Sequence, residues 1–256
     1  MPGLRVIKTS MGGAVVLANG EPMPIRHVIG IGRNYAEHAK EQGAAVPERP
    51  MMFTKNPASV CVDGDAIVIP RICQDRPQVD FEAELAVVLG PTARWTGAIR
   101  DVSEGDALKC VMGYACANDV SARWWQKEGS GGQFCRGKSF DTFCPLGPVV
   151  TLAEEVGDPG ALRVVCRVNG VVKQDAPTSQ MMFTVGRLIA ELSSGTTLVP
   201  GTVILTGTPS GVGMSRTPPE WLKAGDMVEV EITGAGVRGG GLGVLRNVVK
   251  EEGAIG

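Results

Sequence analysis

The chain has 256 residues, 43% of them hydrophobic, and its 25 Lys and Arg residues nearly balance 27 Asp and Glu residues, which gives a formal net charge of −2. No run of basic residues is present to attract a phosphate backbone, so nucleic acid is not an expected partner. No apolar stretch approaches the roughly 20 residues that a membrane-spanning helix needs, and the first residues do not open a signal peptide. We therefore expect a soluble protein of the cytoplasm, or of the mitochondrial matrix if a presequence has been removed, with no membrane partner.

The predicted elements are mostly short strands. Glycine (35 residues) and proline (17 residues) interrupt β-branched runs along the whole chain. Strands are predicted at Ala14–Ala18, His27–Ile31, Ala66–Ile69, Glu84–Leu89, Leu162–Val168, Thr202–Leu205 and Met227–Ile232. Apolar residues at spacings of three and four predict helices at Tyr35–Gln42, Ser103–Val111, Val120–Lys127 and Thr184–Leu192. The pattern predicts an α+β fold, mainly β, with short peripheral helices, in which residues 1–24 form a small N-terminal appendage to a main domain of residues 25–256.

The first motif whose side chains could take part in catalysis follows the strand predicted at His27–Ile31. His38 and Glu41 are three residues apart, so they face the same side of the predicted helix. A carboxylate in that position orients an imidazole and raises its basicity, as a general base requires. A histidine beside a glutamate on a surface helix is also commonplace, and geometry alone favours that interpretation.

The second motif is a pair of acidic residues, Glu82 and Glu84, in the alternating segment Asp80–Gly90. Residues two apart on a strand point to the same face, so the two carboxylates are directed at one place. On an exposed face they would simply be solvated. In a cleft their mutual repulsion would need a cation, and a divalent metal is the natural choice.

A third acidic candidate, Asp119, precedes the helix predicted at Val120–Lys127. Its simplest role is that of a helix N-cap. That role does not account for Arg123 and Gln126, which follow at helical spacing on what we predict to be the same face as Asp119. The set suggests a metal ligand beside an anion-binding edge, although a surface salt-bridge network is a fair rival.

Gly132–Ser139 matches the phosphate-binding pattern G-x-x-x-x-G-K-[ST] letter for letter. That pattern functions only between a strand and a helix, because backbone N–H groups and the helix N-terminus bind the phosphates. Here a helical and then glycine-rich stretch precedes it, and Pro145 and Pro148 follow where a helix should run. We therefore hold a nucleotide-binding function as a remote alternative, and Lys138 is free to serve as a cation near the carboxylates.

The types of residue present limit which metal ion the protein can bind. Only two histidines occur, His27 and His38, so oxygen ligands must dominate, which favours Mg²⁺, Mn²⁺ or Ca²⁺. The seven cysteines are scattered, form no C-x-x-C pair and indicate a reducing compartment rather than a zinc site: Cys61, Cys73, Cys110, Cys116, Cys135, Cys144 and Cys166.

Six motifs in order, over about residues 26–250, resemble the fumarylacetoacetate hydrolase family. They are Gly32-Arg33-Asn34-Tyr35-x-x-His38, Phe53-x-Lys55, Asp80-Phe81-Glu82-x-Glu84-Leu85-Ala86, Asn118–Arg123, Gly137–Pro148 and Thr206–Gly213. The resemblance implies that Glu82, Glu84 and Asp119 bind Mg²⁺ or Mn²⁺, that Lys138, Arg123, Gln126 and Thr208 line the substrate site, and that His38 and Glu41 form a catalytic dyad on a lid. It also implies a mixed β-sandwich or roll and a homodimer. The chain departs from the family pattern at residues 234–243, where a glycine-rich stretch resembles a loop insertion.

The resemblance implies a metal-dependent enzyme acting on a small enolisable oxo acid. Because the dyad is intact, the leading hypothesis is hydrolysis of the C–C bond of an acylpyruvate or related 2,4-dioxo acid, with His38 and Glu41 activating water and Lys138 sharing the enolate charge. Oxaloacetate tautomerisation or decarboxylation is the close alternative, because the Phe140–Pro148 stretch resembles the oxaloacetate tautomerase branch of the family. A non-catalytic oxo-acid binder is a further alternative.

Overall fold

The protein is built on two β-sheets, as shown by a computed structural model that describes residues 3–43, 45 and 47–253. The larger sheet has ten strands in the order β3-β2-β1-β12-β10-β9-β15-β4-β5, with β6 beside β12. Its strands are β1 (Leu4–Thr9), β2 (Gly12–Val16), β3 (Pro22–Pro24), β4 (His27–Gly32), β5 (Met51–Lys55), β6 (Val60–Cys61), β9 (Ala83–Leu89), β10 (Val111–Asn118), β12 (Cys144–Leu152) and β15 (Thr202–Leu205).

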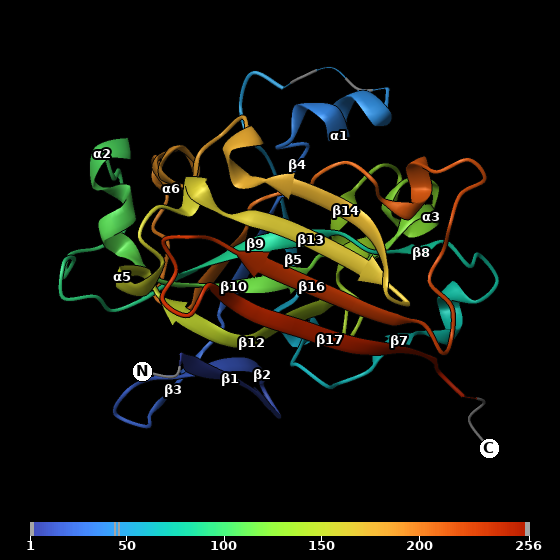
Figure 1. Ribbon diagram of the computed structural model, residues 1–256, viewed down its shortest axis with the longest axis horizontal. Helices are drawn as coiled ribbons and strands as arrows, with labels where there is room; N and C mark the ends of the chain where they lie inside the picture. The colour runs from blue at the N-terminus through green and yellow to red at the C-terminus, as the bar shows by residue number, and fades with distance from the viewer. Residues whose placement is uncertain (1–2, 44, 46, 254–256) are drawn as a thin grey trace.

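The second sheet has five strands in the order β14-β13-β16-β17-β7 and runs across the front of the molecule in Figure 1. These strands are β7 (Ile67–Ile69), β13 (Arg163–Val168), β14 (Val171–Pro177), β16 (Met227–Thr233) and β17 (Gly241–Glu251). A separate two-stranded ladder pairs β8 (Val79–Asp80) with β11 (Ser121–Ala122).

Short helices surround the sheets (Figure 1). They are α1 (Ala36–Glu41), α2 (Glu104–Ala107), α3 (Arg123–Gln126), α4 (Phe134–Lys138), α5 (Ala153–Val156) and α6 (Val185–Ser193). Short 3₁₀ turns occur at Pro57–Ser59, Arg71–Cys73, Leu108–Cys110, Glu128–Ser130, Pro159–Ala161, Thr178–Gln180 and Gly213–Ser215. This confirms the predicted α+β, mainly β, class. In the part of the chain that the structure describes, no helix is long and apolar enough to cross a membrane.

Strand β9 lies in the middle of the larger sheet and is buried on both faces. Leu85 and Val87 join the core between the two sheets, whereas Ala86 and Val88 join a second core on the opposite face. This division follows from the alternation of side chains along a strand. A strand covered on both sides provides a rigid base for the carboxylates at its N-terminal end.

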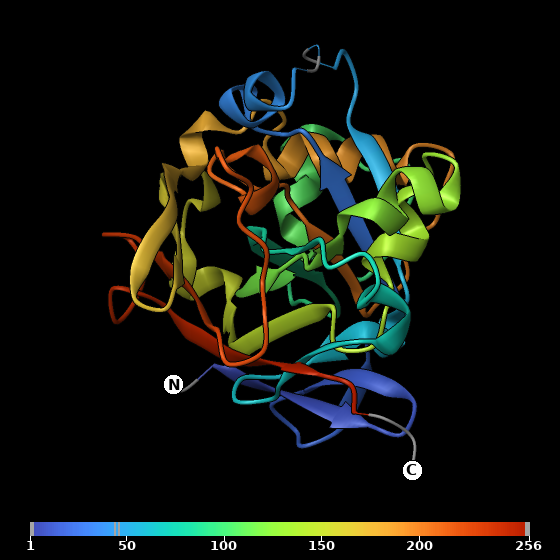
Figure 2. The ribbon, with the colours of Figure 1, turned by 90° about the vertical axis from the view of Figure 1, so that its right-hand side faces the viewer.

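The first three strands extend the larger sheet. β1 pairs with β12 in antiparallel fashion, and Figure 2 shows these N-terminal strands lying along one edge of the molecule. Val6, Val15 and Met23 are buried in the second core, beside Val88 and Val150. The division of the chain at residue 24 remains a prediction, but the segment before it contributes to the core.

Two of the predicted helices differ from the structure. Val120–Lys127 is not one helix, because Ser121 and Ala122 are extended and pair with β8, which leaves only α3 as helix. Within the predicted helix Ser103–Val111, the α-helical part is α2, a 3₁₀ turn follows it, and Val111 already belongs to β10. Strand pairing overrides the local apolar spacing at Ser121, Ala122 and Val111.

Candidate active site

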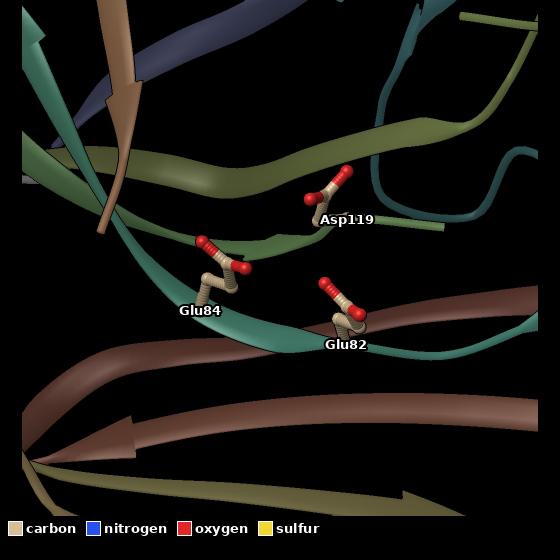
Figure 3. Close-up of side chains that lie close together, drawn as sticks. All are labelled: Glu82, Glu84 and Asp119. Atoms are coloured by element: carbon tan, nitrogen blue, oxygen red, sulfur yellow. The ribbon is translucent and has the colours of Figure 1, made fainter. Parts of the chain in front are cut away.

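The strand register brings three carboxylates together. In the antiparallel β9–β10 pair, Glu84 is opposite Ala117, and just beyond the ladder the Asp119 N–H donates a hydrogen bond of 2.8 Å to the Glu82 carbonyl. Asp119 therefore lies across from Glu82, and Glu84 is their neighbour on the same face. One oxygen from each of the three buried carboxylates lies within 4.8 Å of the others. Figure 3 shows the three side chains close together.

Asp119 does not cap a helix. The N-cap of α3 is Ala122, and the Asp119 carboxylate instead pairs with two lysines. The hypothesis that Asp119 shares a helical face with Arg123 and Gln126 is also wrong, because extended residues separate it from α3. Arg123 is connected to the acidic cluster through Glu82, with which its guanidinium forms an ion pair.

Two buried lysines bind the carboxylates directly. The Lys138 ammonium lies 2.7 Å from Glu82 and 2.5 Å from Asp119, and the Lys55 ammonium lies 2.6 Å from the other oxygen of Asp119. Sequence reasoning assigned no role to Lys55, although it belongs to one of the motifs that resemble the family. Its apolar surroundings in β5 were the only local sign that its charge would need a buried partner.

The phosphate-loop interpretation fails on geometry. α4 ends at Lys138, whereas a phosphate-binding loop requires a helix to begin there. The Lys138 ammonium pairs with Glu82 and Asp119 instead of standing at a helix N-terminus.

Arg123 is held in place by Asp80. The Arg123 Nε donates to Asp80 at 2.9 Å, and Asp80 also accepts hydrogen bonds from the backbone N–H groups of Gly213 and Met214. The same guanidinium pairs with Glu82 at 2.7 Å and donates to Gln126 at 3.0 Å. Arg123 thus connects the carboxylate cluster to the pocket wall, and its charge is already balanced within the protein.

The pKa values of the two glutamates move in opposite directions. Burial alone would raise the pKa of Glu82, but Lys138 and Arg123 outweigh it and hold that pKa well below its ordinary value. Burial, followed by repulsion from Asp119 and Glu82, raises the pKa of Glu84 well above its ordinary value. Glu84 accepts a 2.7 Å hydrogen bond from the Gly207 N–H and has no lysine or arginine partner in the described ranges. A divalent cation would supply the missing positive charge, so the three residues fit a metal.

His38 and Glu41 form a pair on α1. The His38 Nδ1 lies 2.7 Å from Glu41, whose other oxygen accepts from the Gly211 N–H at 2.9 Å. Because a carboxylate only accepts hydrogen bonds, Nδ1 carries the proton and Nε2 accepts from Gln42 at 2.9 Å. An imidazole in this tautomer presents the unprotonated nitrogen that a general base needs.

A narrow pocket joins these groups. Its lining includes His38, Gln42, Glu82, Arg123, Gln126, Phe134, Lys138 and Thr208. The pocket has a free volume of about 20 Å³, little more than the roughly 10–15 Å³ that one water needs. An oxo acid therefore enters only if α1 or the lining side chains move. The structure brings all nine residues predicted for the site to this region, with Glu41 behind His38, and with Glu84 and Asp119 beside Glu82.

Residues 27–250 match the family described as fumarylacetoacetate (FAA) hydrolase C-terminal. The chain belongs to the fumarylacetoacetate hydrolase family. It is 46% identical over 210 residues to the mitochondrial oxaloacetate tautomerase of Homo sapiens and 45% identical to that of Bos taurus, and each match covers 82% of this chain and 64% of the relative. The chain thus spans less than two thirds of the length of these curated relatives.

Solved structures of fumarylacetoacetate hydrolase relatives share the fold. The fumarylacetoacetate hydrolase of Exiguobacterium antarcticum is 32% identical with a TM-score of 0.77, and the match covers 98% of this chain and 99% of that one. The 5-carboxymethyl-2-hydroxymuconate delta-isomerase of Mycobacterium smegmatis is 32% identical with a TM-score of 0.74, and the match covers 98% and 94%. The family and the fold predicted from the motifs are therefore confirmed.

The glycine-rich stretch at residues 234–243 contributes no residue to the lining of this pocket. Residues 234–240 connect β16 to β17, and β17 begins at Gly241. None of the predicted site residues falls in this stretch, and its status as an insertion remains a prediction.

Proposed function

We propose that this fumarylacetoacetate hydrolase family enzyme uses a divalent metal to interconvert the keto and enol forms of oxaloacetate. The supporting observation is the buried Glu82–Glu84–Asp119 cluster, which stands beside Lys138 at the end of a pocket. Relatives at 45–46% identity are named oxaloacetate tautomerases, so this reaction now takes precedence over acylpyruvate hydrolysis.

The three carboxylates would hold Mg²⁺ or Mn²⁺, because all their donor atoms are oxygens. When bound, the metal would act as a Lewis acid toward the 2-oxo group. Lys138 would share negative charge that develops on the substrate oxygen, and the side-chain NH2 of Gln126 would donate a hydrogen bond from the pocket wall, which Thr208 also lines.

We assign the proton transfer to His38. Tautomerisation removes a proton from C3 of the keto form and places one on the oxygen at C2, with no net change in atoms or charge. The unprotonated Nε2 is suited to accept the C3 proton, and Glu41 stabilises the imidazolium that results. Gln42 donates a hydrogen bond to Nε2 in this structure, so this bond must break before Nε2 can accept a proton from the substrate.

Acylpyruvate hydrolysis is the second candidate, and the assembled His38–Glu41 pair favours it. The same base would deprotonate a water that attacks the distal carbonyl of a 2,4-dioxo acid. Oxaloacetate decarboxylation is a third outcome of the same enolate chemistry. A homodimer, and a location in the mitochondrial matrix or the cytoplasm, are proposals that accompany this assignment.

The test compares substrates in one assay. With Mg²⁺, we expect rapid loss of enol oxaloacetate absorbance, little pyruvate from oxaloacetate, and a loss of roughly 10²-fold or more in His38→Ala, the usual scale of general acid–base catalysis. Glu37→Ala, an exposed change on the same helix, serves as the control and should retain activity. Cleavage of acetylpyruvate by an enzyme that leaves enol oxaloacetate untouched would replace the tautomerase with the hydrolase.

A further inference from the structure

Arg33 lies in the connection between β4 and α1 and lines the pocket together with His38 and Lys138. Its backbone has a φ of 56°, in the left-handed region that residues other than glycine seldom adopt. Strained conformations of this kind persist only where neighbouring structure enforces them, and they cluster at ligand sites.

The neighbours of Arg33 do enforce this conformation. Gly32 pairs with Met51 in the β4–β5 ladder. The Asn34 side chain donates to the carbonyls of Phe183 and Thr206 at 3.0 and 2.7 Å and accepts from the Phe183 N–H at 2.8 Å. Arg33 is therefore fixed from both sides, and its side chain extends from a rigid base.

The guanidinium of Arg33 has no partner among the residues that the structure describes. The other cations around the site are paired: Lys55 with Asp119, Lys138 with Glu82 and Asp119, and Arg123 with Asp80 and Glu82. The Arg33 side chain makes no hydrogen bond or ion pair in the described part of the chain, and its Nε is buried without a partner. A buried donor left unpaired is costly, which indicates that a ligand satisfies it.

We propose that Arg33 binds a second carboxylate of the substrate, so that the site selects dicarboxylic 2-oxo acids over monocarboxylic ones. The planar fork of a guanidinium matches a carboxylate and forms two parallel hydrogen bonds with it. Arg33 approaches from the β4–α1 connection, whereas Gln126 and Lys138 approach from α3 and α4. A substrate held at the carboxylate cluster by its 2-oxo acid end thus meets Arg33 with its distal end. The inference rests on the proposed oxo-acid function.

The test uses two ligands that differ only at the distal end: oxaloacetate, and 2-oxobutanoate, in which a methyl group replaces the second carboxylate. Dissociation constants are measured by calorimetry with Mg²⁺ for the wild type and for Arg33→Asn, since Asn tolerates the left-handed backbone. We expect the wild type to bind oxaloacetate about 10- to 100-fold more tightly than 2-oxobutanoate, the scale of a charge-assisted hydrogen bond. Arg33→Asn should lose this preference and bind 2-oxobutanoate as the wild type does.

Two further variants serve as controls. Arg33→Lys keeps the charge without the fork and should retain an intermediate preference for oxaloacetate. Arg26→Asn removes the same charge from an exposed position at the opposite end of β4 and should change neither constant.

The outcomes separate this inference from the proposed function. If the wild type binds 2-oxobutanoate but shows no preference for oxaloacetate, the role of Arg33 is refuted and the oxo-acid function stands. Equal weakening of both ligands by Arg33→Asn would make Arg33 a structural residue and also refute the inference. Failure of the wild type to bind either ligand with Mg²⁺ would remove the proposed function, and this inference with it.

Discussion

At the scale of single residues, the site is defined by a buried charge that the protein itself leaves unbalanced. Glu82 and Asp119 have lysine or arginine partners, whereas among the residues that the structure describes the Glu84 carboxylate accepts a hydrogen bond only from the Gly207 N–H. Burial and the neighbouring carboxylates raise the pKa of Glu84, so its ionised form is costly in the metal-free protein. A divalent cation bound at the cluster would stabilise that ionised form.

Glu84→Gln should therefore abolish metal binding without lowering the stability of the metal-free protein. Glutamine keeps the shape and removes the charge, so the metal-free variant should unfold at the same temperature as the wild type or higher. A metal that binds only the folded state at 100 times its dissociation constant adds about 2.7 kcal/mol to the wild type, and the variant should lose this gain. The measurement is the unfolding temperature with and without Mg²⁺, with the exposed change Glu251→Gln as a control. An undiminished Mg²⁺ effect in Glu84→Gln would contradict the assignment.

At the scale of elements, the site depends on how closely α4 packs on α3. Gly137 allows this approach, because a Cβ at that position would lie 2.4 Å from the backbone nitrogen of Gln126 and 2.8 Å from the carbonyl oxygen of Ala122. Both atoms belong to the backbone and cannot rotate away. The short α4 places Lys138 on the carboxylates only while this contact is kept.

Gly137→Ala should push the two helices apart. We expect a loss of about 1–3 kcal/mol in the free energy of unfolding, the usual cost of overpacking, together with lower activity because Gln126 and Lys138 both shift. Gly105→Ala in α2 is the matched control, since a Cβ there meets open space and should stabilise the helix by up to about 1 kcal/mol. Urea titration and the enolisation assay measure the two effects. Equal behaviour of the two variants would show that the α3–α4 contact is not critical.

At the scale of the whole molecule, the N-terminal strands and the family domain share one core. The match to the family begins at residue 27, yet Val6, Val15 and Met23 are buried against Val88 and Val150 of the larger sheet. The boundary of sequence similarity is thus not a boundary of packing.

Deletion of residues 1–24 should consequently destabilise the protein although it removes no site residue. Each buried apolar side chain of this size contributes about 1.5–3 kcal/mol, and a typical domain has only about 5–15 kcal/mol to lose. We expect the truncated chain to aggregate or to unfold at a much lower temperature, as measured by thermal denaturation. A truncated protein as stable as the full chain would support an independent appendage instead. Replacing the exposed Met11 with Ser in the full chain is the control.

The sequence alone identified the pieces that depend on local periodicity. The spacing of Glu82 and Glu84 placed both carboxylates on one face, and the spacing of His38 and Glu41 predicted a pair that the structure forms at 2.7 Å. The strand Thr202–Leu205 was predicted with its observed bounds. These features depend on residues a few positions apart, for which strand and helix geometry fix the direction of the side chains.

The tertiary structure alone decided which distant residues meet. Local pattern offered a helix cap as the simplest role of Asp119, but the β9–β10 register places it opposite Glu82, and no local signal encodes that register. The pairings of Lys55 with Asp119, and of Arg123 with Asp80, join residues 64 and 43 positions apart. That Arg33 lacks a partner in the described residues is likewise visible only once the partners of the other cations around the pocket are known. A sequence shows which charges exist, whereas folding determines which of them are neutralised, because ion pairing depends on distances that only long-range packing sets.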